Sequence, residues 1–469
     1  MTQTDSLAPG WLKVPTDLNH IDRKLWPETL RRGDNGDLLI GGVPAGQLAA
    51  QYGTPLMIMD KRDFFDRAKR VKAAFDNEAE RIGTSAKVYY AGKSLLTTEI
   101  VKWVSQLGLN LDVSTGGELA LALAGGLDGS RIGLHGNNKS LYEIGRAVDA
   151  NVGAIVIDSE IEIERIASVA GAQDKIQGVR IRVNSGVHAH THEYLATARE
   201  DQKFGIAIAD VPDLVARIRS HSHLRFLGLH SHIGSQIFSV EGFLESVNRL
   251  LPLHKQLLED GEVPELNLGG GFGINYTSAD DAPEIEFFAE AISNAVATEC
   301  AKLEIKVPIL CFEPGRAISG PSGITLYNVG TTKDVVLSEQ GSQVRKYVSI
   351  DGGMSDNARP SLYSADYSAT LASRTSNADP ALSRIVGKHC ESGDIVVRDC
   401  YLPQDVAPND LVAVAATGAY CHSLASNYNY VTRPAIVSVE SGESAVLLRA
   451  ETEADMFARD PGYRDGLAG

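Results

Sequence analysis

The stretch KVYYAGKSLL, Lys87 to Leu96, decides the fold because it begins a pattern that recurs along the chain. Val88 to Ala91 form a short apolar run typical of a buried strand, and Lys93 follows where that strand should end. Similar apolar runs begin near residues 109, 132, 154, 179, 226, 265 and 309, and amphipathic helical sequence fills most of the gaps. Eight strand–helix units with parallel crossovers predict a (β/α)8 barrel of the TIM type.

The residues that follow these predicted strands are mostly ionisable side chains or glycine. Active-site residues of such a barrel gather at the carboxyl ends of its strands, so the sequence predicts one polar cavity there. The predicted strand ends carry Lys93, Asp112, His135, Asp158, Arg182, His232, Gly269, Gly270, Gly271, Glu313 and Arg316.

A different pattern begins at about residue 320, where strand-like runs such as KYVSIDGG and DLVAVAATGAY follow one another without helical sequence. They predict a second, all-β domain of sandwich or barrel type, which the apolar run TPLMIMD (Thr54–Asp60) joins. We therefore expect an α/β protein in three parts. Residues 1–60 contribute to the β domain, residues 61–318 form the barrel and residues 319–469 form the C-terminal β domain.

The 469-residue chain is 43% hydrophobic and 22% charged, with a formal net charge of -16. This composition is typical of a soluble globular protein, and the negative charge argues against nucleic acid or an anionic membrane as a partner. No apolar run is long enough to predict a membrane span, and MTQTDSLAPGW lacks the pattern of a signal peptide. The five cysteines lack metal-type spacing, so we expect reduced thiols and a cytoplasmic protein.

Three motifs at the predicted barrel mouth suggest chemistry, and each has a structural alternative. Lys93 can form a Schiff base, or it can be a strand-end lysine whose ammonium reaches water. The glycines of LNLGGGFGI (Leu266–Ile274) and the turn HIGSQ (His232–Gln236), with the Ser235 hydroxyl, are suited to a phosphate group. In FEPGRAISG, Glu313 can face a cationic ring nitrogen and Arg316 an anion, or the two can form an ion pair.

The histidines raise the possibility of a metal site. HAHTH (His188, His190 and His192) and HSH (His230–His232) place imidazoles on one face of an extended chain. No carboxylate stands at a convincing ligand spacing from them, so we expect no metal, and the role of HAHTH stays open.

Three further motifs fall in the predicted β domain. In CESGD, Cys390 and Glu391 are either a buried thiol with a surface glutamate or an acid and a substrate anchor. RPSLY (Arg359–Tyr363) and TGAYCHSLASNYN (Thr417–Asn429) read as loops, in which Arg359 is a surface arginine and Tyr363 and Tyr420 are half-buried, unless they reach a site.

Taken in this order, YYAGKS, HIGSQ, GGGFG, EPGR, RPSLY, CESGD and GAY…SNYN resemble the motifs of the diaminopimelate decarboxylase family. That family shares a pyridoxal-phosphate fold with alanine racemase and eukaryotic ornithine decarboxylase. The resemblance covers about residues 40 to 450, and RPSLY and CESGD are its specific parts. The chain departs from the pattern at Ser94, where relatives often have alanine, and in SADYSATLASR after Tyr363.

The resemblance implies a role for each matching residue. Lys93 would bind the cofactor covalently, His232 would stack on its ring, and Glu313 would meet its ring nitrogen. Cys390 would donate a proton to the substrate carbon, and Glu391 would bind the distal amino group. The other implied cofactor contacts are Asp112, Ser235, Gly269, Gly270, Gly271, Gly315, Arg316 and Tyr420, and the other implied substrate contacts are Arg316, Arg359, Tyr363 and Tyr420.

The expected reaction is therefore decarboxylation of meso-2,6-diaminopimelate to L-lysine and CO2 by a homodimer with shared active sites. Arg316 and Arg359 suit a distal carboxylate, and ornithine has no such group, so these arginines favour diaminopimelate as the substrate. A racemase on the same fold, a non-catalytic pyridoxal-phosphate carrier and a metal-dependent barrel hydrolase are the alternatives.

Overall fold

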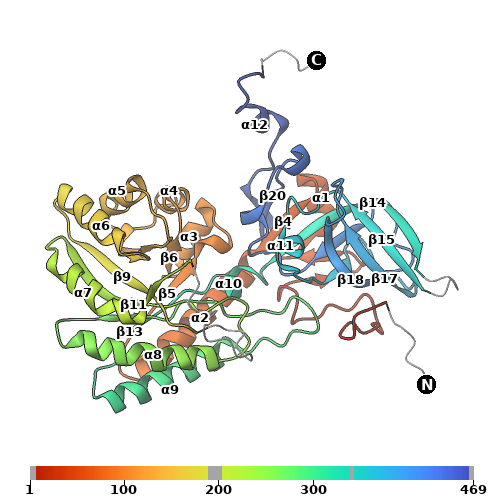
Figure 1. Cartoon of the computed structure of the whole chain (residues 1–469). Helices are drawn as coiled ribbons and strands as arrows, with labels where there is room; N and C mark the ends of the chain where they lie inside the picture. Colours follow the sequence, from red (N-terminus) through yellow and green to blue (C-terminus); the bar gives the residue numbers. More distant parts are fainter. Residues whose placement is uncertain (1–6, 188–202, 338–342, 464–469) are drawn as a thin grey trace. The chain divides into compact units, whose positions relative to one another are not determined.

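The computed structural model describes residues 7–187, 203–337 and 343–463 of the protein (Figure 1). The chain divides into two compact units. The barrel unit holds residues 65–273 and 282–318, and the β-rich unit holds Met1–Phe64, Ile274–Asp281 and Ser319–Gly469. Within the described residues, no helix has both the length and the apolar character needed to cross a membrane.

Eight parallel strands close the barrel, because the last of them, β13, pairs with the first, β5. Their bounds in chain order are β5 (Ala86–Ala91), β6 (Asn110–Val113), β7 (Ile132–Leu134), β8 (Ala154–Ile157), β9 (Gln177–Asn184), β11 (Leu224–His230), β12 (Glu265–Asn267) and β13 (Ile309–Phe312). The closed parallel barrel confirms the fold predicted from the recurring apolar runs.

Amphipathic helices alternate with these strands, and polar side chains fix where several of them begin. Thr97 accepts a hydrogen bond from the Ile100 amide, and Ser140 with Glu143 forms a capping box. The helices are α2 (Lys61–Arg81), α3 (Thr98–Gln106), α4 (Gly116–Ala124), α5 (Leu141–Asp149), α6 (Ile161–Ala172), α7 (Val211–Ser220), α8 (Glu241–Leu258) and α9 (Ile285–Leu303). Because these caps fix the first residue of each helix, they also fix the length of the turn that connects it to the preceding strand.

A buried ion pair lies inside the barrel. The Arg180 guanidinium on β9 lies 2.6 Å from the Glu265 carboxylate, and these side chains are only 1% and 4% exposed. Arg180 also donates to the Tyr89 hydroxyl at 2.8 Å, and Lys87 reaches Glu265 at 2.6 Å. Because Glu265 begins β12 and Lys87 is near the start of β5, this network occupies the interior toward the amino ends of the strands.

The β-rich unit is built around a sheet of order β18-β17-β15-β14-β4-β20-β21, to which β16 and β19 add. The strand β4 (Leu56–Asp60) pairs antiparallel with β14 and parallel with β20, which confirms that an N-terminal strand joins the C-terminal sheet. The other strands are β14 (Gly323–Val336), β15 (Val344–Ile350), β16 (Ala369–Leu371), β17 (Pro380–Val386), β18 (Ile395–Pro403), β19 (Leu411–Val414), β20 (Ala435–Glu440) and β21 (Glu443–Leu448).

This unit also contains short elements that the sequence pattern did not indicate. A small sheet is formed by β1 (Arg31–Arg32), β2 (Leu38–Ile40) and β3 (Val43–Pro44), and α1 (Ala45–Tyr52) follows it. The segment RPSLY is a short helix, α11 (Arg359–Tyr363), so its interpretation as a loop was wrong. Proline is accommodated near the start of α11, where its missing N–H has no helical partner to lose.

Candidate active site

Lys93 lies in a tight turn at the carboxyl end of β5. The turn Gly92–Ser94 is a single 3-10 turn in which Gly92 and Ser94 are buried and the Lys93 side chain is exposed. The Ser94 hydroxyl donates to the Ala91 carbonyl at 2.8 Å, so the serine that departs from the family pattern anchors this turn. The positive charge of Lys93 acts on the ionisation of Asp112, Glu118 and His232, which places the ammonium at the same end of the barrel as those groups.

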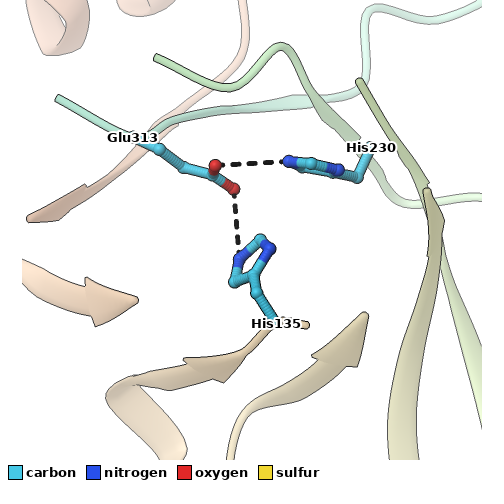
Figure 2. Close-up of side chains that lie close together, drawn as sticks. All are labelled: His135, His230 and Glu313. Carbon is cyan, nitrogen blue, oxygen red and sulfur yellow. Dashed lines mark hydrogen bonds and ion pairs between the residues drawn. The ribbon is translucent and has the colours of Figure 1, made fainter. Parts of the chain in front are cut away.

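Glu313 follows β13 and is held by two histidines, as Figure 2 shows. Its Oε2 lies 3.2 Å from His230 Nε2, and its Oε1 lies 3.4 Å from His135 Nε2. Oε1 also accepts a hydrogen bond of 2.6 Å from the Asn267 amide group. Burial alone would raise the pKa of Glu313, but the hydrogen bond and electrostatic attraction of the imidazoles outweigh it, so the pKa lies well below its usual value. Glu313 is therefore ionised.

Asp112, at the end of β6, behaves in the opposite way. Its Oδ1 lies 3.2 Å from His135 Nε2, yet burial and the negative charge of Glu313 raise its pKa well above the usual value. Burial also lowers the pKa of His135 to about 4. Of these two carboxyl groups, Glu313 therefore carries the negative charge, and it can hold a cationic ring nitrogen.

Two glycine-containing turns lie side by side next to Glu313. The Ile237 amide donates to the Gly271 carbonyl at 2.9 Å, and the Gly270 amide lies 3.3 Å from His232 Nδ1. A Cβ at Gly270 would lie 2.1 Å from the Glu313 carbonyl oxygen, and Gly271 has a φ of +102°. Only glycine fits at these two positions. Because glycine has no side chain, a ligand can approach the backbone amide groups of the turns closely.

A cation borders the same turns. Arg316 is 9% exposed, and its Nη2 donates to the Ser235 hydroxyl at 2.8 Å. Glycine amides, a hydroxyl and a guanidinium together make a suitable site for a phosphate group. Gly315, between Glu313 and Arg316, packs closely on the barrel strand β5, since a Cβ there would lie 2.9 Å from the Ala91 Cβ.

The metal alternative has a structural basis that the sequence did not indicate. His188, His190 and His192 lie outside the described residues. His230, however, does have a carboxylate partner in space, and single ligand atoms of His135, His230 and Glu313 lie within 4.8 Å of one another. Glu313 has partners without an ion, because it bonds to His230 and lies close to His135 as Figure 2 shows, although His230 Nδ1 and His135 Nε2 are buried and form no hydrogen bond within the described residues.

The remaining predicted site residues belong to the β-rich unit. Arg359 is only 6% exposed, so its interpretation as a surface arginine was wrong, whereas Tyr363 is exposed. Cys390 and Glu391 are exposed in the loop between β17 and β18. Tyr420 follows β19 with a left-handed φ of 61° and is partly exposed.

The Cys390–Glu391 loop is anchored at both sides by Asp394. The Asp394 carboxylate accepts hydrogen bonds from the His389 amide at 2.8 Å and from the Met354 amide at 2.6 Å. The Gly387 amide in turn donates to the Asp394 carbonyl at 3.0 Å. The thiol and the carboxylate are thus displayed at the tip of a fixed turn.

Comparison with known proteins agrees with this architecture. The family model described as "Pyridoxal-dependent decarboxylase, pyridoxal binding domain" matches residues 63–320. The glycine turns, the cation beside them, the ionised Glu313 and the strand-end lysine fit that cofactor. Barrel and site therefore define a pyridoxal-dependent decarboxylase with pyridoxal phosphate as its cofactor.

Relatives that match nearly the whole chain identify the family within the pyridoxal-dependent decarboxylases. The diaminopimelate decarboxylase of Mycobacterium tuberculosis is 48% identical over 450 residues, which cover 94% of this chain and 99% of the relative. That of Bacillus subtilis is 39% identical over 443 residues, with 94% and 98% covered. The crystal structure of the M. jannaschii diaminopimelate decarboxylase in co-complex with L-lysine has a TM-score of 0.86 and 31% identity, and covers 93% of this chain and 98% of that one. The chain belongs to the diaminopimelate decarboxylase family, as its motifs predicted.

Sequence reasoning missed several residues that shape these sites. His135 was noted only as a strand end and His230 only as a metal candidate, although both hold Glu313. Asn267, which fixes the other carboxylate oxygen, stands in LNLGGGFGI but carried no separate signal. His135 follows β7, His230 ends β11, Asn267 ends β12 and Glu313 follows β13, so only the closed barrel brings these four residues together.

Proposed function

We propose that the protein decarboxylates meso-2,6-diaminopimelate to L-lysine and CO2, the last step of lysine synthesis. The observation that carries this proposal is the ionised Glu313 at the same barrel end as Lys93, in a chain 48% identical to a diaminopimelate decarboxylase over 450 residues. Pyridoxal phosphate supplies an electron sink for the charge left on the substrate carbon when CO2 departs. The protein must hold it and orient the substrate.

The residues of the barrel unit are suited to holding the cofactor. Lys93 would bind it covalently, Glu313 would hold its ring nitrogen in the cationic form, and His232 would cover one face of the ring. Burial and the charge of Lys93 lower the pKa of His232 well below its usual value, so this imidazole is neutral. The remaining proposed cofactor contacts are Asp112, Ser235, Gly269, Gly270, Gly271, Gly315, Arg316 and Tyr420.

Residues of the β-rich unit would bind and protonate the substrate. Arg359, with Tyr363, Arg316 and Tyr420, would bind substrate carboxylate, and Glu391 would bind the distal ammonium. The Cys390 thiol would donate its proton to the carbon from which CO2 leaves, as a general acid. The exposure of the CESGD turn in a single chain fits residues that act in a neighbouring subunit.

We also propose a homodimer in which Cys390 and Glu391 of one chain complete the site of the other. An exposed apolar surface adjoins their loop, because Ser361 donates to the Gly393 carbonyl at 2.9 Å and His389 Nδ1 lies 3.1 Å from Asn429 Oδ1. Monomeric proteins seldom expose large apolar patches without a partner. The exposed side chains of this surface are Leu362 (60%), Tyr363 (65%), Tyr428 (41%) and Tyr430 (72%).

Two further expectations remain proposals. The sequence-based domain bounds, residues 61–318 and residues 319–469 joined by residues 1–60, are proposed as the two functional domains. A cytoplasmic location is proposed because none of the five cysteines, all of which lie in the described residues, forms a disulfide, as expected for reduced thiols in that compartment.

The direct test is to incubate the purified protein and pyridoxal phosphate with meso-diaminopimelate, ornithine or arginine, and to measure CO2 and the amine product. CO2 and lysine from diaminopimelate alone are expected. CO2 from another amino acid would contradict the proposed roles of Arg359 and Glu391. Racemisation without CO2 release, or cofactor binding without any turnover, would favour the racemase or the carrier instead.

A further inference from the structure

Arg359 carries a buried charge whose neighbours are neutral. Its Nη1 donates to the Tyr367 hydroxyl at 2.6 Å, and its guanidinium carbon lies 4.5 Å from the centre of the Tyr276 ring and 5.5 Å from that of Tyr367. Within the part of the chain that the structure describes, no carboxylate forms an ion pair with it. A buried cation without a counter-ion is costly, so this environment suits an anion that arrives with a ligand.

The two tyrosines are themselves held firmly. Their rings meet edge to face at 5.2 Å, and they are only 5% and 1% exposed. The Tyr367 hydroxyl lies 3.5 Å from Cys421 Sγ, and that thiol donates to Asn357 Oδ1 at 3.5 Å. Burial raises the pKa of Tyr367 well above its usual value, so it remains a neutral phenol that accepts from Arg359 without cancelling its charge.

The backbone of Tyr276 is fixed by a turn of its own. The Asp280 carboxylate accepts hydrogen bonds from the Tyr276 amide at 2.9 Å and the Thr277 amide at 2.8 Å. This turn lies in the segment Ile274–Asp281, which groups with the β-rich unit although it follows the glycines of the barrel turn in the chain. One tyrosine thus comes from that segment and the other from the segment after α11, and both meet Arg359.

We propose that Tyr276 and Tyr367 are positioning residues that orient the Arg359 guanidinium toward the distal carboxylate of the substrate and so set selectivity for substrates that carry one. This inference rests on the proposed function. Tyr367 accepts from Nη1, and the guanidinium carbon lies over the Tyr276 ring at 4.5 Å from its centre. Within the described residues Nη2 and Nε form no hydrogen bond, so this edge of the guanidinium can donate to both oxygens of a carboxylate. An acidic residue in place of either tyrosine would have neutralised the arginine before substrate arrived.

Two compounds, each measured as an inhibitor of diaminopimelate turnover, isolate this effect. Loss of one CO2 from diaminopimelate leaves L-lysine, which keeps the distal carboxylate, whereas 1,5-diaminopentane lacks it. Tyr367→Phe and Tyr276→Leu are each expected to raise the inhibition constant of L-lysine and the KM for diaminopimelate about tenfold. The inhibition constant of 1,5-diaminopentane should change less than about twofold, because that ligand makes no use of Arg359. The matched control is Tyr347→Phe, whose ring faces a guanidinium at 5.9 Å elsewhere in the same unit and which should alter neither constant.

The inference is overturned if the variants leave L-lysine inhibition unchanged, or if they weaken both inhibitors equally, as a general loss of structure would. If Tyr367→Phe does not fold, the inhibition constants of L-lysine and 1,5-diaminopentane measured with Tyr276→Leu test the inference in the same way. Wild-type protein that makes no lysine from diaminopimelate would instead refute the proposed function, so the two failures are distinguishable.

Discussion

Removing the Glu265 side chain should strongly destabilise the barrel. Its carboxylate lies 2.6 Å from the guanidinium of Arg180, whose side chain is 1% exposed. In Glu265→Leu the guanidinium would keep its hydrogen bond to the Tyr89 hydroxyl, but it would lose its buried counter-ion. Breaking a buried pair in this way costs about 3–5 kcal/mol of the free energy of unfolding. Urea unfolding followed by far-ultraviolet circular dichroism measures this loss.

The control for Glu265→Leu is Lys87→Met. Lys87 reaches the same carboxylate at 2.6 Å, but its side chain is 42% exposed. An ion pair of that kind contributes at most about 1 kcal/mol. The double variant Arg180→Met/Glu265→Leu should recover most of the loss, because the only charge it leaves without its partner is that of Lys87, whose side chain is 42% exposed. The reasoning is refuted if Glu265→Leu loses no more stability than Lys87→Met. It is also refuted if the double variant loses as much stability as Arg180→Met and Glu265→Leu lose together.

The Arg180–Glu265 pair also predicts that the stability of the barrel depends on pH. Burial alone would raise the pKa of Glu265, but Arg180 and Lys87 outweigh it and hold the pKa below its usual 4.5. A depressed carboxyl pKa stabilises the folded state above the unfolded-state pKa, and this contribution is lost as the pH falls through the folded-state pKa. The difference in stability between wild type and Glu265→Leu should therefore be largest near neutral pH and should decrease below about pH 4.

Three predictions concern the proposed site. Lys93→Ala should lose the visible absorbance of lysine-bound pyridoxal phosphate, and an unchanged spectrum would disprove covalent binding there. Cys390→Ala should lower kcat by about 10²-fold or more while cofactor stays bound, and mixed Lys93→Ala and Cys390→Ala subunits should regain activity. Loss of cofactor, or inactive verified heterodimers, would contradict these roles. Gly270→Ala, whose Cβ would lie 2.1 Å from the Glu313 carbonyl oxygen, should weaken cofactor binding about tenfold or more by fluorescence titration, and unchanged binding would disprove the phosphate turn.

The barrel was predictable because its strands are short, apolar and separated by amphipathic helices. All eight predicted starts fall within two residues of a barrel strand, as at β5, which begins at Ala86. The β-rich unit was predictable only in outline. Its small elements α1 and α11 are too short to show helical periodicity, and tertiary contacts decide them.

The candidate site was predictable where one side chain follows one strand and less so where function depends on neighbours. Lys93 and the glycines of LNLGGGFGI stand out in the sequence. The burial of Arg359 does not, because arginine in a polar segment is usually exposed, and the tyrosines that cover it come from separate segments.

Position alone also fails to tell which of two buried acids at the barrel mouth carries the charge. Asp112 lies near the carboxyl end of β6 and Glu313 follows β13, and both lie within 3.4 Å of His135. Glu313 differs because it also has His230 and the Asn267 amide as partners, so its ionised form is stabilised. That charge in turn raises the pKa of Asp112. Two adjacent carboxyl groups thus divide into one anion and one neutral acid, and in the proposed function a cationic ring nitrogen would meet a single negative charge in a defined place.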